Sequence, residues 1–432
     1  MSAAHDGSPH VASTGEEKLV KKLIISSALA CFSAVGQTSN PVVQWNRELL
    51  AIVRTPGAQP ATIHSTWDMA ILHAAIYDAV NSIAGGHTAY KVLLPNVPAG
   101  ASEDAAATTA GHEVLVNLYP SFQTRLDAFE QQLLSAIPDS TAKTNGAQVG
   151  VSVADQILLL RANDGSANGA NPALPQYVST GLPGDYQSTP PNTPKAQFFH
   201  WSEVTPFVLP MANQFRPGPP PALTSSQYTT VFNEIESIGM ALSTAATMEQ
   251  KIIGVFWNGS IQDYWQEIVQ TTTVAKSLNT EETARLFAMV NIALADSVIA
   301  FYDAKYVYNF WRPVTAIRVA DTDGNPGTIA SPAWLPETTT TAADPSYPGA
   351  HATISSAAAT VLAAFTGSDQ FTFAVTSEVF AGVARPFTSF SGAAQEASLS
   401  RIYAGQHFRS DEDAGTQLGT SVAQLVVTNL LQ

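Results

Sequence analysis

Apolar residues recur at helical spacing along most of the chain. The segment 65–83 begins at Ser65, a candidate N-cap, and its apolar stripe consists of Met69, Leu72, Ile76 and Val80. The same spacing predicts further N-terminal helices at 102–119, 121–136 and 140–162. Strand-type alternation is scarce, so the pattern predicts an all-α protein.

The segment 163–222 interrupts this helical pattern. It is rich in Pro, Gly, Asn and Ser, and its end, PGPPPAL, cannot continue a helix. The stretch AQFFHWSEVTPFVLP at 196–210 is nevertheless too aromatic to stay in water. We therefore expect an ordered connection between two helical halves, and not a disordered linker.

Helical patterning resumes after residue 222. The predicted helices cover 225–242, 246–275, 280–311, 350–365, 372–383, 393–404 and 409–430. The helix at 280–311 starts with Asn279 and Glu282 in capping-box spacing and is apolar on two sides, as is typical of the central helix of a bundle. The fold prediction is two successive helical bundles with long irregular connections and little or no sheet. The N-terminal bundle with its connection covers 37–222, and the C-terminal bundle covers 223–432.

Composition limits the partners of the protein. The chain has 432 residues, 45% of them hydrophobic and 13% charged, which fits a compact globular protein. Its formal charge of −15 argues against nucleic-acid binding and against attraction to anionic membranes. Beyond the N-terminal region we expect no stable membrane span, because no uninterrupted apolar run is long enough. An anion site must therefore concentrate scarce Lys and Arg side chains locally.

Residues 1–36 have the order of an export signal. Three lysines precede the apolar run LIISSALACFSAVG at 23–36, which ends in small residues. A buried or amphipathic N-terminal helix is the alternative. Cys31 is the only cysteine, so cleavage after this segment leaves a mature chain without disulfides or thiolate metal sites. We expect an exported protein, either periplasmic or extracellular.

Three stretches of the C-terminal half concentrate cations and histidines. The first, KYVYNFWRP at 305–313, places Lys305 and Arg312 seven residues apart, about two helical turns, on one face. Pro313 then kinks or ends the helix. Taken alone, such a pair is more often a solvated or salt-bridged surface than a site.

The second stretch, YPGAH at 347–351, opens a helix of small residues. The amides of Gly349 and Ala350 are expected to face outward at its positive end, where anions bind, with His351 beside them. A histidine at a helix start is by itself more often an ordinary capping residue. The second stretch therefore indicates a site only in combination with the others.

The third stretch, SRIYAGQHFRSDED at 400–413, contains Arg401, His407 and Asp411. Asp411 lies four residues after His407 and is placed to accept a hydrogen bond from one imidazole nitrogen if a helix restarts there. Such a bond fixes the tautomer and leaves the other nitrogen free as a ligand or a nucleophile.

In this order, the patterns K-x6-R-P, P-G-A-H and S-R-x3-G-x-H-x3-D closely resemble the signature shared by vanadium-dependent haloperoxidases and type 2 phosphatidic acid phosphatases. The signature covers 305–411, about a quarter of the chain. The segments TWDMAILHAAIYDAVN and HWSEVTPF extend the similarity to secreted bacterial haloperoxidase-like proteins.

The resemblance implies a vanadate-dependent haloperoxidase that uses hydrogen peroxide to oxidise a halide, with a small organic molecule as the final substrate. It implies that His407 binds vanadium and that His351 is the general acid/base. The expected vanadate-oxygen ligands are Lys305, Arg312, Arg401 and the amide of Gly349 or Ala350. Phosphate is expected to fit the same site.

Two alternatives remain open. In the phosphatase branch of the superfamily His407 attacks phosphorus and His351 protonates the leaving alcohol, which implies a soluble acid phosphatase here. The third hypothesis is an oxyanion-binding or structural protein without activity. Large aromatic helical surfaces are compatible with a homodimer.

The chain departs from the family pattern at two positions. Members usually carry a serine where Gly349 stands, and the loss of one neutral hydrogen bond, about 1 kcal/mol, predicts weaker vanadate retention. Ser346 is nearby, three residues out of phase. Asp344 stands where well-known relatives have an aromatic residue or a histidine near the halide, and a carboxylate there repels halides. We therefore expect bromide or iodide to be preferred over chloride.

Overall fold

The computed structural model describes residues 40–430, except residues 61 and 170. The signal peptide predicted at 1–36 lies outside the described residues, so export stays a prediction. The homodimer likewise stays a prediction.

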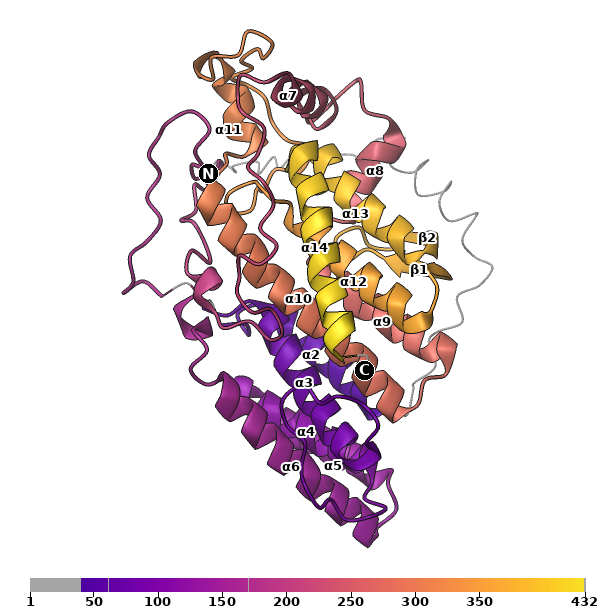
Figure 1. Ribbon diagram of the computed structural model, residues 1–432. Helices are drawn as coiled ribbons and strands as arrows, with labels where there is room; N and C mark the ends of the chain where they lie inside the picture. The colour runs from indigo at the N-terminus through magenta and orange to yellow at the C-terminus, as the bar shows by residue number, and fades with distance from the viewer. Residues whose placement is uncertain (1–39, 61, 170, 431–432) are drawn as a thin grey trace, which may run out of the picture.

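Helices make up most of the described chain, which confirms the all-α prediction (Figure 1). The N-terminal half contains α2 (Pro41–Val53), α3 (Ser65–Ala84), α4 (Glu103–Leu118), α5 (Gln123–Ser135) and α6 (Thr141–Arg161). The C-terminal half contains α7 (Ser226–Ile238), α8 (Met248–Phe256), α9 (Ile261–Lys276), α10 (Thr280–Tyr308), α11 (Pro313–Arg318), α12 (Ala350–Thr366), α13 (Phe390–Tyr403) and α14 (Arg409–Leu430). Short 3-10 turns lie at Pro120–Phe122, Ser166–Asn168, Trp201–Glu203 and Ala320–Thr322.

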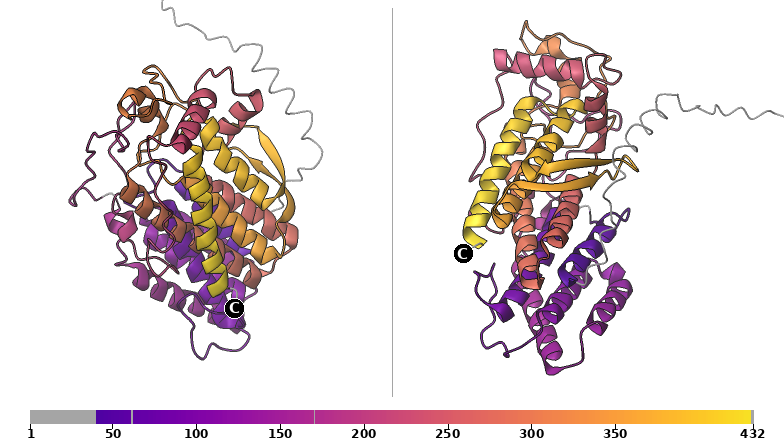
Figure 2. Two further views of the ribbon diagram at one scale, coloured as in Figure 1. Left: turned by 45° about the horizontal axis from the view of Figure 1, so that its top comes forward. Right: turned by 90° about the vertical axis from the view of Figure 1, so that its right-hand side faces the viewer.

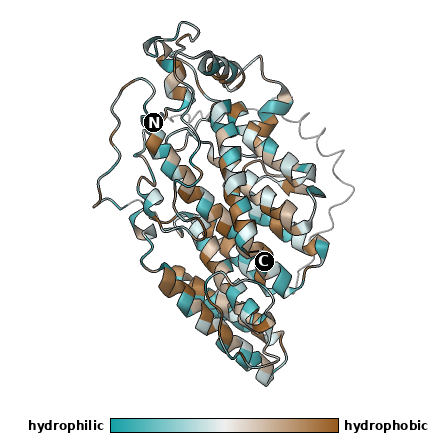
Figure 3. Ribbon diagram, in the orientation of Figure 1, coloured by the Kyte–Doolittle hydropathy of each residue, from teal (hydrophilic) through white to brown (hydrophobic). Residues whose placement is uncertain are grey.

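The long helix α10 is the axis of the fold. It packs against α3 on one side and against α12 and α14 on the other, so one hydrophobic core runs through both halves (Figures 1 and 2). As predicted, Asn279 and Glu282 form the capping box at its start, with bonds of 2.8 and 3.0 Å. By length and composition α10 alone among the described helices could cross a membrane, but 94% of its most apolar window is buried inside the protein. The peripheral helices mix polar and apolar residues (Figure 3).

The connection between the halves is ordered, as its aromatic content predicts. Phe207 is buried, and Asp296 of α10 accepts hydrogen bonds from the three consecutive amides 207–209 at 2.6–2.8 Å. Asp303, two turns further along α10, is bonded by both Nε and Nη2 of Arg216 at 2.6 and 2.8 Å. Two carboxylates of the axial helix therefore hold a segment that has little regular structure of its own.

The helix predicted at 372–383 is wrong. Residues Gln370–Thr376 form strand β1, which pairs antiparallel with β2 (Ala384–Ser389) at the side of the C-terminal bundle (Figure 2). The sequence QFTFAVT alternates β-forming side chains at a period of two, and Phe373 and Val375 are the buried ones. This alternation covers only seven residues and lies between helical segments.

Other element boundaries also differ from the predictions. The segment predicted as one helix at 246–275 is two helices, α8 and α9, separated by residues 257–260. Helix α2 was not predicted. The N-cap of α3 is His64 and not Ser65, because His64 Nδ1 accepts the Thr66 amide at 3.3 Å.

The end of α10 corrects a prediction that matters for the site. Lys305 and Arg312 do not share one helix face, because α10 ends at Tyr308 and Asn309 adopts a left-handed conformation with φ of 52°. Arg312 is the N-cap of α11, and Pro313 occupies the first position of that helix. The two cations are therefore brought together by a turn between two helices.

Helices α12 and α14 approach each other closely. A Cβ atom at Gly419 of α14 would lie 2.8 Å from the carbonyl carbon of Thr353, and one at Gly415 would lie 3.0 Å from Thr353 Oγ1. Small residues on α12, such as Ala352, complete the contact from the other side. Because α12 and α14 each begin at the candidate site, this close contact sets the distance between their first turns.

Replacement of Gly419 by alanine tests this contact. We expect Gly419→Ala to lower the free energy of unfolding by about 1–3 kcal/mol, because the added methyl group meets the backbone of α12. Urea denaturation measures the change. Gln417→Ala, at an exposed position of the same helix, is the matched control. Equal stability of Gly419→Ala and the wild-type protein would contradict the close contact.

Candidate functional site

The structure brings the predicted cations and histidines to one buried place where several elements begin or end. Lys305 comes from the last turn of α10, Arg312 from the start of α11, His351 from the first turn of α12, Arg401 from the last turn of α13, and His407 from the loop before α14. All are buried except His351, which is half-buried. Each lies at a helix end or in the loop next to one, where the local chain direction changes and a side chain can point inward.

Lys305 and Arg312 meet at Asp344. Arg312 donates to both the carboxylate and the backbone carbonyl of Asp344, the latter at 2.9 Å, and Lys305 Nζ lies 3.3 Å from the same carboxylate. Lys305 also donates to the carbonyl groups of Pro345 and Ser346. Burial lowers the pKa of Lys305 to about 8. Against the opposing effect of burial, these two cations hold the pKa of Asp344 below its usual range.

Asp344 therefore lies among the cations. The expectation that it repels a halide by itself needs revision, because its charge is paired with Lys305 and Arg312. Its main electrostatic effect in this structure is to reduce the net positive charge of the site.

His407 is held in one tautomer. Its Nε2 lies 2.9 Å from Nη1 of Arg312, and because a guanidinium only donates, Nε2 must carry a lone pair. Its Nδ1 faces Asp411 Oδ2 at 3.4 Å and Ser346 Oγ at 3.3 Å. Burial lowers the pKa of His407 well below its usual value, and the charge of Arg312 lowers it further. The imidazole is neutral, and its lone pair points toward the cations.

Asp411 and Ser346 hold the far side of this imidazole. Asp411 Oδ2 accepts from Ser346 Oγ at 2.6 Å and from the amide of Phe408 at 3.1 Å. Burial raises the pKa of Asp411 to about 6. Ser346 thus lies behind the histidine, next to Asp411, and its hydroxyl is bound there.

The loop between α8 and α9 positions the other two predicted residues. His351 Nε2 lies 3.0 Å from the carbonyl oxygen of Trp257, so this nitrogen carries the proton and donates it. Arg401 Nη1 donates to Oδ1 of Asn258 at 3.0 Å. Burial lowers the pKa of His351 well below its usual value and the pKa of Arg401 to about 10. Nothing in the sequence motifs had indicated this loop.

The two amides at the start of α12 that were expected to bind an anion differ in whether they are already hydrogen-bonded. The Gly349 amide donates to the backbone carbonyl of Asp411 at 2.8 Å, so it is already occupied. No described side chain caps the helix, which leaves the Ala350 amide at its positive end as the better candidate.

Glu412 is a site residue that the sequence analysis missed. Its side chain is buried, Oε1 lies 3.8 Å from His407 Nδ1, and neither carboxyl oxygen has a hydrogen-bond partner among the described residues. A Cβ atom at residue 349 would overlap Glu412 Oε1 and lie 2.6 Å from Cδ, so the carboxyl takes the space that a side chain at 349 would need. Burial raises the pKa of Glu412 to about 8, with Arg401 opposing.

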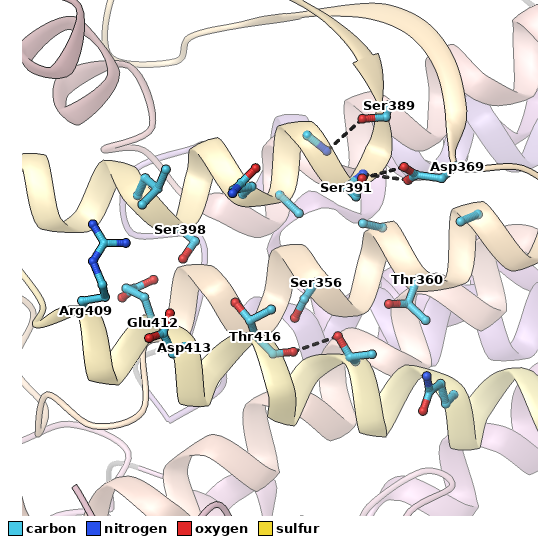
Figure 4. Close-up of a pocket in the computed structure, with 18 residues that line it drawn as sticks. Ser356, Thr360, Asp369, Ser389, Ser391, Ser398, Arg409, Glu412, Asp413 and Thr416 are labelled. Atoms are coloured by element: carbon cyan, nitrogen blue, oxygen red, sulfur yellow. Dashed lines mark hydrogen bonds between the residues drawn. The ribbon is translucent and has the colours of Figure 1, made fainter. Parts of the chain in front are cut away.

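Glu412 also lines a groove of about 840 Å³ between α12, α13 and α14 (Figure 4). Arg409, Asp413 and Thr416 lie around it, and Ser398 faces the same carboxyl without a hydrogen bond of normal geometry. None of the five predicted cations and histidines lines this groove. Glu412 therefore forms a wall between the groove and the candidate site.

Comparisons with known proteins show which family the sequence and the fold resemble. Residues 285–432 match the model of the VCPO second helical-bundle domain. The vanadium chloroperoxidase of Curvularia inaequalis is 26% identical over 204 residues, which cover 39% of this chain but only 33% of that protein. The chain thus spans about a third of the length of this relative.

Solved structures extend the similarity to most of the chain. A bacterial vanadium-dependent iodoperoxidase superposes with a TM-score of 0.74 at 24% identity, covering 90% of this chain and 96% of its own. A holo-type bacterial vanadium-dependent chloroperoxidase gives a TM-score of 0.66 at 16% identity, covering 87% and 94%. The resemblance expected from the three motifs is confirmed: residues 285–432 match the model of the VCPO second helical-bundle domain, and the chain has the helical fold of the bacterial vanadium haloperoxidases.

Proposed function

We propose that this protein is a vanadate-dependent haloperoxidase, which oxidises bromide or iodide with hydrogen peroxide to a hypohalous species. The observation that supports this most strongly is the lone pair of His407 Nε2, which faces Arg312 at 2.9 Å, while the buried cations Lys305 and Arg401 are close enough to lower the pKa of the ring. A neutral imidazole nitrogen is a metal ligand, and clustered guanidinium and ammonium groups neutralise the oxygens of an anion.

The residues of the site fit vanadate. Arg401 Nε is a buried donor without a partner among the described residues, so an oxygen atom at this place would satisfy it. His407 would hold vanadium through Nε2 in place of its hydrogen bond from Arg312, and the oxygens would lie against Lys305, Arg312, Arg401 and the Ala350 amide. When bound, vanadate polarises hydrogen peroxide for attack by a halide, without a change in the oxidation state of the metal.

The remaining side chains orient groups and move protons. Asp411 fixes the direction of His407 through Nδ1, because that nitrogen faces its carboxylate. His351 donates a hydrogen bond from Nε2 to the carbonyl oxygen of Trp257. Its Nδ1 is therefore left to accept a proton from peroxide and to return it. Its low pKa keeps that nitrogen available as a base near neutral pH.

Asp344 supports the preference for bromide and iodide. Because this carboxylate neutralises part of the charge on Lys305 and Arg312, these cations would make a bound vanadate less electrophilic than three unpaired cations would. Iodide and bromide are oxidised more easily than chloride. The iodoperoxidase among the structural neighbours is in line with this preference.

Halide oxidation after vanadate loading tests the proposal. Protein purified without phosphate and supplied with orthovanadate should halogenate a phenolic dye with peroxide and bromide or iodide. We expect His407→Ala to lose at least about 10³-fold in kcat/KM, because the ligand and its orientation are both removed. Arg409→Ala, which removes a half-exposed ion pair with Glu234 outside the cation cluster, is the control and should remain active.

The same preparations separate the alternatives. Hydrolysis of a phosphomonoester by the vanadate-free protein, with no halide oxidation after loading, would favour the soluble acid phosphatase. Binding of vanadate without either activity would favour an oxyanion-binding protein.

The pKa of Lys305 predicts the pH dependence of anion binding. The ammonium group is charged below about pH 8 and neutral above it, so phosphate affinity should fall as the pH rises from 7 to 9. In Lys305→Arg the charge persists, and the fall should be smaller. Calorimetric titrations of both proteins measure the ratio of their affinities, in which the protonation of phosphate itself cancels. An identical pH profile for the two proteins would show that Lys305 does not titrate in this range.

A further inference from the structure

The carboxyl of Glu412 and the Nε atom of Arg401 are complementary groups without partners. Both are buried near His407, with Glu412 on the Nδ1 side of the ring, and neither makes a hydrogen bond of normal geometry with a described residue. The Ser398 hydroxyl is close enough to the carboxyl to lower its pKa. The two side chains also affect each other electrostatically, since Glu412 raises the pKa of Arg401 against the effect of burial. Buried polar atoms of this kind are uncommon unless a ligand or water bonds to them.

A hydroxyl group satisfies both residues at once. Arg401 only donates, so its partner must accept. A carboxyl presents at least one accepting oxygen in either protonation state, so the partner of Glu412 must also donate. Near pH 7, phosphate and vanadate carry hydroxyl groups, whereas sulfate and molybdate carry none.

Gly349 makes the position of Glu412 possible. A residue with a Cβ atom at 349 would overlap the carboxyl, so Glu412 can hold this position only while residue 349 is a glycine.

We infer that Glu412 is a specificity-determining residue of the oxyanion site: it accepts a hydrogen bond from a hydroxyl of the bound anion and selects anions that carry one. This inference rests on the proposed function, because it places the anion among the cations that face His407. It also names the ligand class, a tetrahedral oxyanion with at least one hydroxyl group.

Charge alone predicts the opposite preference. Sulfate is a full dianion near pH 7, whereas phosphate is partly a monoanion, so three cations by themselves attract sulfate more strongly. When sulfate is bound, a carboxyl oxygen of Glu412 has no donor, and this unpaired oxygen reverses the preference for sulfate over phosphate. The phosphate-to-sulfate ratio therefore reports on Glu412 and not on the cation cluster.

Calorimetric titration of the vanadate-free protein near pH 7 tests the inference without measuring turnover. We expect phosphate to bind at least about tenfold more tightly than sulfate, and low-micromolar vanadate to be preferred over molybdate in the same way. In Glu412→Met both carboxyl oxygens are removed, so sulfate leaves no accepting oxygen unpaired and the phosphate-to-sulfate ratio should fall to within about threefold. Asp413→Asn removes an exposed carboxylate from the same helix turn and should leave the ratio unchanged.

Each outcome decides the matter. Equal binding of sulfate and phosphate by the wild-type protein would overturn the inference without any variant, and so would an unchanged ratio in a folded Glu412→Met protein. Either result leaves the haloperoxidase proposal standing if vanadate still binds. If the wild-type protein binds none of the four anions, the inference fails together with the proposed function.

Discussion

The rest of the site depends on the hydrogen bonds that the guanidinium of Arg312 donates. It donates to Asp344, to the backbone of Gln406 and to His407, so it joins the loop before α12 to the loop before α14. Arg312 is itself placed by the turn between α10 and α11. Without this side chain, buried carbonyl, carboxylate and imidazole acceptors would lose their common donor, at the cost that unpaired buried polar groups carry.

Burial of so many charged groups requires that they be paired. The three cations Lys305, Arg312 and Arg401 share the site with the carboxyls of Asp344, Asp411 and Glu412. Such clusters contribute little net stability, because desolvation offsets most of the attraction. The stability of the fold comes instead from the apolar contacts of α10 and from the close packing of α12 on α14.

The sequence patterns predicted the helical architecture and the cation–histidine set, because both depend on local spacing and on scarce residue types. They misplaced Lys305 and Arg312 on one helix, since a left-handed Asn309 is not visible in helical periodicity. They missed the strand pair, whose seven-residue alternation lies among helical segments. Trp257, Asn258 and Glu412 could not be found from spacing, because their contacts join elements about 90 to 140 residues apart or depend on the space beside a glycine.

The carboxylate of Asp344 has a consequence for how ligands exchange. Since it already occupies donors of Lys305 and Arg312, these long side chains are ordered before any anion arrives, and little conformational entropy is lost when one binds. The same carboxylate competes with the incoming oxygens. An internal counter-ion of this kind gives a preordered site from which the bound anion can dissociate. A cluster of unpaired cations would instead retain the first anion that binds.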